Sequence, residues 1–185
     1  MVINTKTYTS PNFSTRKGVS IDTLIIHHTG GLMPGCANWL CDPRAKASAH
    51  YVITRKGEIY QLVADDLCAW HAGVSEYDFN ADGDIAAGER SINRRSIGIE
   101  LEWLPEKPYT LLQLEANSWL SLEIVKRYNI PIPHILGHKE IAPNRKIDPA
   151  NFDMFEFRNK IQSQLILDGI QPILDRIGGK IPVIL

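Results

Sequence analysis

Short apolar runs, separated by glycine and proline, alternate with polar segments along most of the chain. Residues 21–28 (IDTLIIHH) are apolar and β-branched, which predicts a buried strand. Residues 49–54 and 58–63 flank residues 55–57 (RKG), so we expect a β-hairpin with a glycine in its turn. A further short strand is predicted at residues 134–136 (HIL).

Residues 96–103 (SIGIELEW) alternate regularly between apolar and polar or small side chains. Successive side chains of a strand point to opposite faces. One predicted face carries Ile97, Ile99, Leu101 and Trp103. The other carries Ser96, Gly98, Glu100 and Glu102. The segment therefore predicts a strand with one carboxylate-bearing face.

Residues 110–128 have the clearest helical periodicity. Thr110 and Gln113 predict a capping box at the start of this helix, and Pro131 lies just beyond its end. The predicted apolar stripe contains Leu111, Leu114, Leu122 and Val125.

A second long helix is predicted over residues 153–168. Asp153 and Glu156 predict its capping box, and Gly169 predicts its end. A short helix is expected around residues 37–40. Because strands and helices are interspersed, we expect an α/β fold, a single domain with helices on the faces of a sheet.

The composition is typical of a globular protein. The 185 residues are 44% hydrophobic and 22% charged, and the formal net charge of −1 does not indicate nucleic-acid binding. The N-terminal segment lacks a secretory signal, and no apolar run of about 18 residues is present. We therefore expect a monomer made in the cytoplasm, without a membrane span. Cys36, Cys41 and Cys68 are expected to be reduced, with a Cys36–Cys41 disulfide as the alternative.

Three regions are expected along the chain. Residues 1–20 are polar and predict an extended N-terminal lead-in. Residues 21–168 contain the predicted strands and helices. Residues 169–185 form an apolar C-terminal tail broken by prolines and glycines. We favour a tail that packs back on the domain over one that is exposed for a partner.

Two predicted strands end in histidine. His27 and His28 are adjacent, so their side chains point to opposite faces and at most one of them faces a given site. His138 follows the HIL run, and Asp148 lies beyond it in a proline-stiffened loop that we expect to be non-helical. Two histidines and one carboxylate leave a fourth tetrahedral position open for water, as in catalytic zinc sites.

Five motifs occur in order: IIHHTG, SAHYVI, AWHAG, SIGIELE and GHKEIAPNRKIDP. Together they resemble the type 2 N-acetylmuramoyl-L-alanine amidases over roughly residues 9–160. The resemblance implies a peptidoglycan-recognition-protein-like amidase fold, with a central mixed β-sheet flanked by helices. It also implies that residues 21–168 are a zinc amidase catalytic domain whose partner is peptidoglycan or a muropeptide.

The resemblance implies zinc ligation by His27, His138 and Asp148. It gives no role to His28, which we expect to be structural. These three ligand positions are all filled, which favours an enzyme over a module that only binds peptidoglycan.

The resemblance also implies the general acid/base. Some family members use a tyrosine just before the position of His50, but Ala49 lies there. The recycling amidases use the first glutamate of the IELE motif, which is Glu100. Glu102 lies on the same predicted face, so periodicity alone does not choose between the two glutamates. His50 itself is expected to be a hydrogen-bonded interior residue.

Further residues are expected to contact substrate. Lys146 matches the R-K-x-D-P motif of the family, which implies a catalytic role in stabilising the oxyanion. Arg145 is expected to attract carboxylates of the peptide stem. Trp70 and His71, in the WHAG motif, are expected to line the groove, with a core position for Trp70 as an equal alternative. Trp39 is expected on the groove rim.

Residues 78–89 (DFNADGDIAAGE) fit the D-x-[DN]-x-[DN]-G-x5-E pattern of calcium loops. The oxygen donors would come from Asp78, Asn80, Asp82, Asp84 and Glu89. The alternative is an acidic surface loop without a metal ion.

These observations favour zinc-dependent hydrolysis of the amide bond between the lactyl group of N-acetylmuramic acid and L-alanine. We interpret the chain as a phage or bacterial lytic enzyme, an endolysin released to the cell wall by a holin. The alternatives are a cytosolic amidase that recycles anhydro-muropeptides and a non-catalytic peptidoglycan-binding module.

Overall fold

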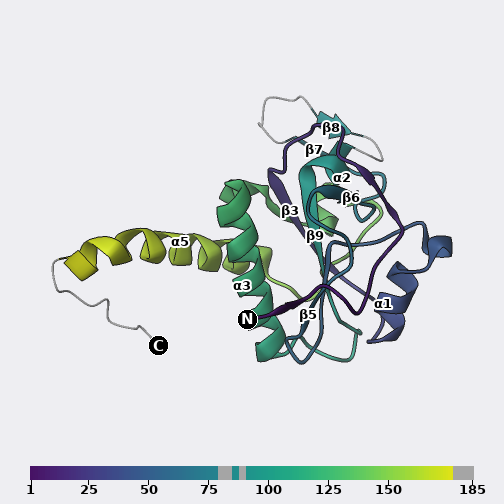
Figure 1. The fold of residues 1–185 in the computed structure, drawn as a ribbon, viewed down its shortest axis with the longest axis horizontal. Helices are drawn as coiled ribbons and strands as arrows, with labels where there is room; N and C mark the ends of the chain where they lie inside the picture. The colour runs from purple at the N-terminus through teal and green to yellow at the C-terminus, as the bar shows by residue number, and fades with distance from the viewer. Residues whose placement is uncertain (79–84, 88–90, 177–185) are drawn as a thin grey trace.

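A six-stranded sheet forms the centre of the computed structural model, which describes residues 1–78, 85–87 and 91–176 (Figure 1). In spatial order, the strands are β1 Ile3–Asn4, β5 Ile59–Gln61, β4 Tyr51–Ile53, β9 Ser96–Leu101, β3 Thr23–His28 and β10 Ile135–Gly137. The β4–β5 pair is antiparallel and the other pairs of this sheet are parallel, so the sheet is mixed.

Helices and two antiparallel ribbons surround this sheet. The ribbons pair β2 Phe13–Thr15 with β6 Leu67–Ala69 and β7 Glu76–Asp78 with β8 Ile85–Ala87. The helices are α1 Gly35–Leu40, α2 Ser91–Arg95, α3 Leu111–Tyr128, α4 His138–Ile141 and α5 Met154–Arg176. Two 3-10 turns lie at η1 Pro43–Ala45 and η2 Ile132–His134.

The two faces of the sheet have different roles. One face packs against α3 and the first half of α5 in the main hydrophobic core (Figure 1). This core includes Leu24, Ile26, Ile97, Ile99, Leu101, Ala116, Leu120, Ile124, Phe157 and Ile161. The predicted apolar side of residues 96–101 is therefore the core side, and the opposite side is free to carry polar groups.

The predicted β-hairpin is confirmed. β4 and β5 pair in antiparallel register, and Gly57 N–H donates to the carbonyl of Thr54 across the turn at 2.9 Å. Gly57 has a φ of +79°, and an added Cβ would lie 2.8 Å from the Leu112 carbonyl oxygen. A side chain there would meet both backbone strain and a clash, which explains the glycine.

The start of α3 differs from the predicted capping box. Thr110 accepts a hydrogen bond from Gln113 N–H at 3.2 Å, as expected. The Gln113 side chain instead donates to the carbonyls of Ile53 and Glu102, at 3.0 and 2.9 Å, and so ties the helix to β4 and to the residue that follows β9. Leu111 of the predicted apolar stripe is 78% exposed. The buried residues of the helix are Gln113, Ala116, Asn117, Leu120, Ser121, Ile124 and Val125.

The N-terminal 20 residues are integrated into the domain. β1 extends the central sheet and β2 pairs with β6. Arg16 is buried, and its guanidinium donates to the carbonyls of Asp65, Arg94 and Ser96 at 2.8, 2.6 and 3.0 Å. Such a buried cation is stabilised by full hydrogen bonding, so this segment fastens three distant parts of the chain together.

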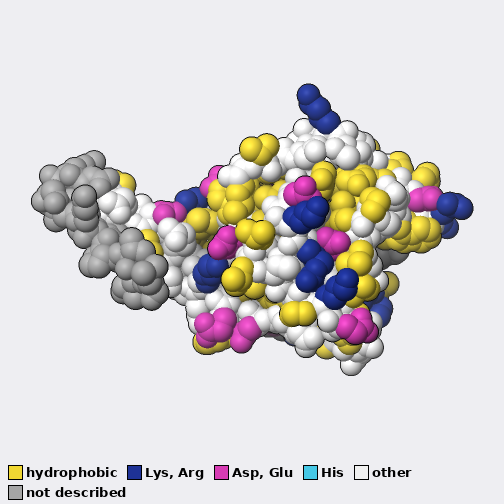
Figure 2. All heavy atoms as spheres, turned by 90° about the horizontal axis from the view of Figure 1, so that it is seen from below, with side chains coloured by type: hydrophobic (Ala, Val, Ile, Leu, Met, Phe, Trp, Pro, Cys, Tyr) yellow, Lys and Arg dark blue, Asp and Glu magenta, His cyan; other side chains and the backbone are white. Residues whose placement is uncertain are grey.

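The prediction that the last helix ends at Gly169 is wrong, because α5 continues to Arg176. Gly169 lacks the left-handed conformation that usually ends a helix, and a glycine within a helix costs only about 1 kcal/mol. Residues 169–172 do not pack back on the domain as we expected (Figures 1 and 2). Ile166, on the same outer half of α5, is 57% exposed. Residues 177–185 lie outside the described residues.

The three cysteines are free. Cys68 is buried, as expected for a reduced interior thiol, whereas Cys36 and Cys41 are only half-buried. The alternative Cys36–Cys41 disulfide is not formed in this structure.

The described surface carries charges of both signs. In Figure 2, lysine and arginine side chains are interspersed with aspartate and glutamate, rather than gathered into a basic patch on this face. Among the helices of residues 1–78, 85–87 and 91–176, none has both the length and the apolarity needed to cross a bilayer.

A buried carboxylate links strands β4 and β5 to α3. Asp65 accepts hydrogen bonds from the hydroxyls of Tyr51 and Tyr128, at 2.5 and 3.0 Å, and from Arg127 at 3.0 Å. Gln61 also donates to it, at 3.2 Å. Removing this carboxylate would leave several donors without an acceptor.

We expect Asp65→Ala to lower the free energy of unfolding by about 2–4 kcal/mol, because buried polar groups lose their partner. Asp168→Ala is the matched control, since Asp168 forms an exposed ion pair with Lys126 that contributes at most about 1 kcal/mol. Urea denaturation of both variants measures the difference. Equal losses would contradict the assigned importance of the Asp65 cluster.

Candidate functional site

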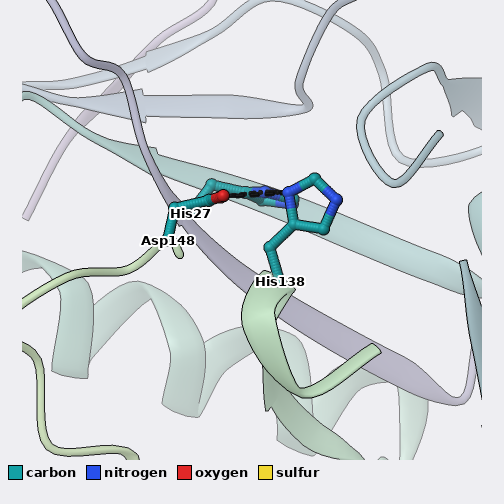
Figure 3. Close-up of side chains that lie close together, drawn as sticks. All are labelled: His27, His138 and Asp148. Atoms are coloured by element: carbon teal, nitrogen blue, oxygen red, sulfur yellow. Dashed lines mark hydrogen bonds and ion pairs between the residues drawn. The ribbon is translucent and has the colours of Figure 1, made fainter. Parts of the chain in front are cut away.

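Two histidines and one aspartate converge at the edge of the sheet (Figure 3). His27 Nδ1 lies 2.9 Å from His138 Nδ1 and 3.1 Å from Asp148 Oδ2. The third distance, from His138 Nδ1 to Asp148 Oδ2, is 3.0 Å. The three side chains, predicted together from sequence, therefore place one ligand atom each at the corners of a small triangle.

Strand pairing brings the two histidines together. β3 and β10 are parallel, with Ile26 opposite Gly137, so the next residues, His27 and His138, lie side by side. His138 begins the one-turn helix α4. The expectation of a wholly non-helical loop after His138 is therefore wrong, because Glu140 accepts a hydrogen bond from Gly137 N–H at 2.6 Å and supports a helical turn.

The loop that carries Asp148 is fastened on both sides. Lys139 N–H donates to the carbonyl of Asp148 at 2.7 Å. Ala150 N–H donates to His28 Nδ1 at 3.1 Å. The His28 ring stacks on the Trp103 ring, with 4.1 Å between the ring centroids. His28 lies outside the triangle, which agrees with the structural role expected for it.

Burial sets the protonation of the cluster. His27 and His138 are 1% and 2% exposed, and Asp148 is 8% exposed. Burial, together with the neighbouring His138 ring, lowers the pKa of His27 to about 4. Burial acts to raise the pKa of Asp148, but the two imidazoles beside it outweigh this effect and hold the pKa well below its usual value. Near pH 7 the cluster thus has a neutral His27 and an ionised Asp148, the states in which these groups bind metal ions.

The donor set fits a divalent cation such as zinc. His138 Nε2 is 2.9 Å from the carbonyl of Ala72, which only accepts, so Nε2–H donates to it and Nδ1 is the nitrogen that faces the other two side chains. Tetrahedral ligands about 2.1 Å from zinc lie about 3.4 Å apart, slightly more than the spacing of this triangle. Two nitrogens and one oxygen leave a fourth position for water, so the site has the pattern of a catalytic centre.

The strand register distinguishes the two candidate glutamates. Glu100 of β9 lies directly opposite His27 of β3, on the same face of the sheet. Glu102 lies beyond the strand, and its carboxylate accepts hydrogen bonds from Met33 N–H at 2.9 Å and Arg55 N–H at 2.7 Å. Glu102 is therefore engaged in holding two loops, a role that sequence periodicity could not reveal.

Glu100 has an unusual environment. Its Oε2 atom is buried and has no hydrogen-bond partner among the described residues. Burial, with a smaller contribution from Asp148, raises the pKa of Glu100 to about 8, although Lys146 acts in the opposite direction. A carboxyl group with such a pKa is able to both accept and release a proton near neutral pH.

The residues that form this site lie in a segment that matches the model of a known protein family. The model of the family described as N-acetylmuramoyl-L-alanine amidase matches residues 17–151. The chain belongs to this family. The match contains His27, Glu100, His138, Lys146 and Asp148.

The similarity of the chain to individual amidases supports this assignment. The chain is 34% identical over 169 residues to the 1,6-anhydro-N-acetylmuramyl-L-alanine amidase AmpD of Escherichia coli (strain K12), covering 80% of this chain and 87% of that protein. A crystal structure of a Se-Met AmpD derivative is similar with a TM-score of 0.69 and 33% identity, over 82% of this chain and 91% of that one. The predicted α/β amidase fold is thereby confirmed.

A second solved structure is relevant to substrate. It is the E. coli amidase AmiD in complex with anhydro-N-acetylmuramic acid-L-Ala-D-gamma-Glu-L-Lys. The TM-score is 0.63 with 28% identity, and the likeness covers 83% of this chain and 59% of that chain.

The triangle of His27, His138 and Asp148 lies in an open cleft of about 520 Å³. Glu100 and Lys146 line this cleft together with the three predicted ligands, and Trp70 lies on its wall. An adjoining hollow of about 710 Å³ is lined by Lys46, Trp70, Arg145 and Lys146, among others. The cleft is thus bordered by basic side chains on one side.

Arg145 is built into the wall of this basic side. Its guanidinium donates to the carbonyls of Ala72 and Val74 at 2.8 and 2.7 Å. It also lies against Gly73, where an added Cβ would be 3.2 Å from a guanidinium nitrogen. Its expected contact with the carboxylates of a peptide stem stays a prediction.

The other residues singled out from sequence are placed clearly. His50 is fully buried; burial and Arg16 lower its pKa to about 3, which agrees with an interior position. Trp39 is 54% exposed and lines a hollow next to Glu100. His71 lines the cleft, but both of its ring nitrogens lie within hydrogen-bond distance of protein atoms. Its expected contact with substrate also stays a prediction.

The predicted calcium loop is largely outside the described residues, because Asn80, Asp82, Asp84 and Glu89 fall in ranges 79–84 and 88–90. Asp78 is described, and it pairs with Ile85 in the β7–β8 ribbon.

The raised pKa of Glu100 predicts a pH dependence for the metal-free protein. Between about pH 4.5 and 8 the folded state keeps a proton on Glu100 that the unfolded chain has released. This contribution to stability is therefore complete at low pH and is lost as the pH rises through about 8. Glu100→Gln removes it, so the variant should gain stability over the wild type as the pH rises from 5 to 8.

Urea denaturation with a chelator present, at several pH values, measures this difference. Glu115→Gln, on the exposed face of α3, is the control and should differ from the wild type by a constant amount. A pH-independent difference for Glu100→Gln would contradict the burial of this carboxyl as a protonated group.

Proposed function

We propose that this amidase hydrolyses the bond between the lactyl group of N-acetylmuramic acid and L-alanine in soluble anhydro-muropeptides. In this proposal zinc is held by His27, His138 and Asp148, Glu100 is the general acid/base, and Lys146 stabilises the oxyanion. The observation that supports it best is the cross-strand register of His27 and Glu100, which gives one cleft both a metal-binding triangle and a proton carrier.

When bound, zinc supplies Lewis-acid chemistry and lowers the pKa of a coordinated water to about 7. Two imidazoles and one carboxylate suit this ion, and oxygen-preferring cations such as magnesium and calcium are less well matched. The adjacent cleft leaves space for both water and the scissile amide.

The protein residues handle the proton and the charge. In its ionised form, Glu100 takes the proton of the attacking water, which forms a bond to the amide carbon. It then delivers that proton to the departing nitrogen of L-alanine as the C–N bond breaks. Lys146 lines the same cleft, and its ammonium group offsets the negative charge that develops on the carbonyl oxygen.

The substrate assignment departs from the endolysin interpretation favoured by the sequence analysis. AmpD, the E. coli relative at 34% identity, is named for a 1,6-anhydro substrate, and the substrate bound to AmiD is also an anhydro-muropeptide. The recycling alternative is therefore better supported than the lytic role. Holin-dependent release and a calcium site at residues 78–89 find no support in the described residues and are not part of the proposal.

A purely binding module is disfavoured. Such a module would not need a glutamate whose buried oxygen is without a partner beside the metal-binding triangle. Leaving this group unsatisfied costs stability, which is understandable if the group is used in catalysis.

We expect Glu100→Gln to lower kcat by about 10²–10⁴-fold, because proton transfer is lost. Lys146→Ala should lower kcat by about 10²–10³-fold, because one oxyanion partner is lost. Both variants should retain bound zinc. The release of peptides with a free L-alanine amino group from a purified muropeptide measures these rates.

Glu102→Gln is the matched control for these activity measurements, since it makes the same change two residues away in a carboxylate that holds loops. It should lower stability while the folded enzyme keeps most of its rate. If Glu102→Gln and Glu100→Gln lost activity equally, the assignment of Glu100 as the acid/base would be wrong.

The substrate preference is tested separately. We expect a higher kcat/KM on soluble anhydro-muropeptides than on intact sacculi, measured by chromatographic detection of released peptide. Comparable or faster digestion of sacculi would favour the lytic interpretation over the recycling one, and it would leave the proposed amidase chemistry unchanged.

A further inference from the structure

The side chain of His71 lies between a predicted metal ligand and a buried serine. His71 Nδ1 is 3.0 Å from His27 Nε2, and its Nε2 is 3.1 Å from Ser96 Oγ. Ser96 is fully buried and His71 is almost fully buried. Both ring nitrogens are thus engaged within the protein, on the side of His27 remote from the metal-binding triangle.

The direction of this hydrogen-bond chain follows from its last member. Ser96 Oγ is 2.6 Å from the carbonyl of Ile92, which only accepts, so the serine hydroxyl donates to it. Ser96 Oγ then accepts from the Nε2–H of His71. A neutral His71 consequently has its lone pair on Nδ1 and accepts from the Nε2–H of His27. His27 is left with a lone pair on Nδ1, the atom that points into the triangle.

The adjacent residue acts in the same way on the second histidine. The carbonyl of Ala72 accepts from His138 Nε2 at 2.9 Å. The backbone of this dipeptide is itself held, because Asn93 Oδ1 accepts from the N–H groups of His71 and Ala72 at 3.2 and 2.8 Å. One rigid dipeptide therefore contacts the outer nitrogen of both predicted histidine ligands.

Strand β9 makes room for the His71 ring. An added Cβ at Gly98 would lie 2.6–2.9 Å from three ring atoms of His71. Those atoms belong to a rigid ring rather than a flexible end, so the ring would have to move. The glycine of the SIGIELE motif thus has a steric reason to be there.

We propose that His71 is a positioning residue, which accepts a hydrogen bond from His27 and so fixes the tautomer that presents Nδ1 to zinc. This proposal rests on the proposed function, since it assumes that the triangle binds zinc. Groups that orient metal-bound histidines in this manner typically contribute 10–100-fold to metal affinity. His71 then acts through His27 instead of contacting substrate.

Two substitutions at this position separate the hydrogen bond from the volume of the ring. His71→Phe keeps an aromatic ring but has no acceptor for His27. His71→Asn places an oxygen where Nδ1 was, so it keeps the acceptor. We expect His71→Phe to weaken zinc binding by about 10–100-fold and His71→Asn to recover most of that loss.

Zinc affinity is measured by competition between the full-length apoprotein and a chromophoric chelator, without substrate. Tyr51→Phe is the control for general destabilisation, because the Tyr51 hydroxyl contacts Asp65 and Gln61 and none of the metal-binding groups. A second readout is the imidazole N–H signal of His27 in NMR spectra of the zinc-loaded protein. This proton should exchange slowly in the wild type and His71→Asn and rapidly in His71→Phe.

The outcomes distinguish this inference from the proposed function. Zinc affinity equal in the wild type and His71→Phe would overturn the role of His71 and leave the zinc amidase intact. Equal losses in His71→Phe and His71→Asn would also overturn it, since the acceptor would then be irrelevant. A wild type that binds no zinc would overturn the proposed metal centre and the role of His71 with it.

Discussion

The parallel pairing of β3 with β9 on one side and β10 on the other is the constraint on which the site depends. This register places Glu100 opposite His27 and sets His138 beside it. A slip of one residue would turn each of these side chains to the other face of the sheet. Burial of Leu24 and Ile26 against α3 prevents such a slip. Packing on one face of the sheet therefore fixes the positions of His27 and Glu100 on the other face.

The same burial that excludes water prepares the protonation states of the site. A low-dielectric environment disfavours a charged imidazole and a charged carboxyl that lacks a partner, so it lowers the pKa of His27 and raises that of Glu100. The pKa of Asp148 is lowered instead, because the two imidazoles beside it stabilise its charge. The result is a site with two carboxyl groups in different protonation states, Asp148 ionised beside the two imidazoles and Glu100 with a raised pKa.

Support for the site comes from segments far apart in the chain. The loop of Asp148 is held through His28, the dipeptide of His71 and Ala72 is held through Asn93, and Arg16 fastens the N-terminal segment to the carbonyl of Ser96. These contacts fix the positions of residues that line the cleft. An amidase site of this kind is therefore a property of the whole domain.

The local pattern of the sequence by itself determined most of the strands and helices and the candidate site residues. Apolar runs and turn residues predicted the strands, alternation predicted the face of Glu100, and the resemblance of five motifs to the type 2 amidases implied the ligand residues. The choice between Glu100 and Glu102 was decided only by tertiary structure, because both share one parity while different loops approach them. The continuation of α5 beyond Gly169 and the engagement of His71 with His27 were likewise decided in three dimensions. The identity of a glycine does not determine its φ, so Gly169 could either end the helix or lie within it. The sequence around a histidine does not determine which distant atoms lie near its two ring nitrogens.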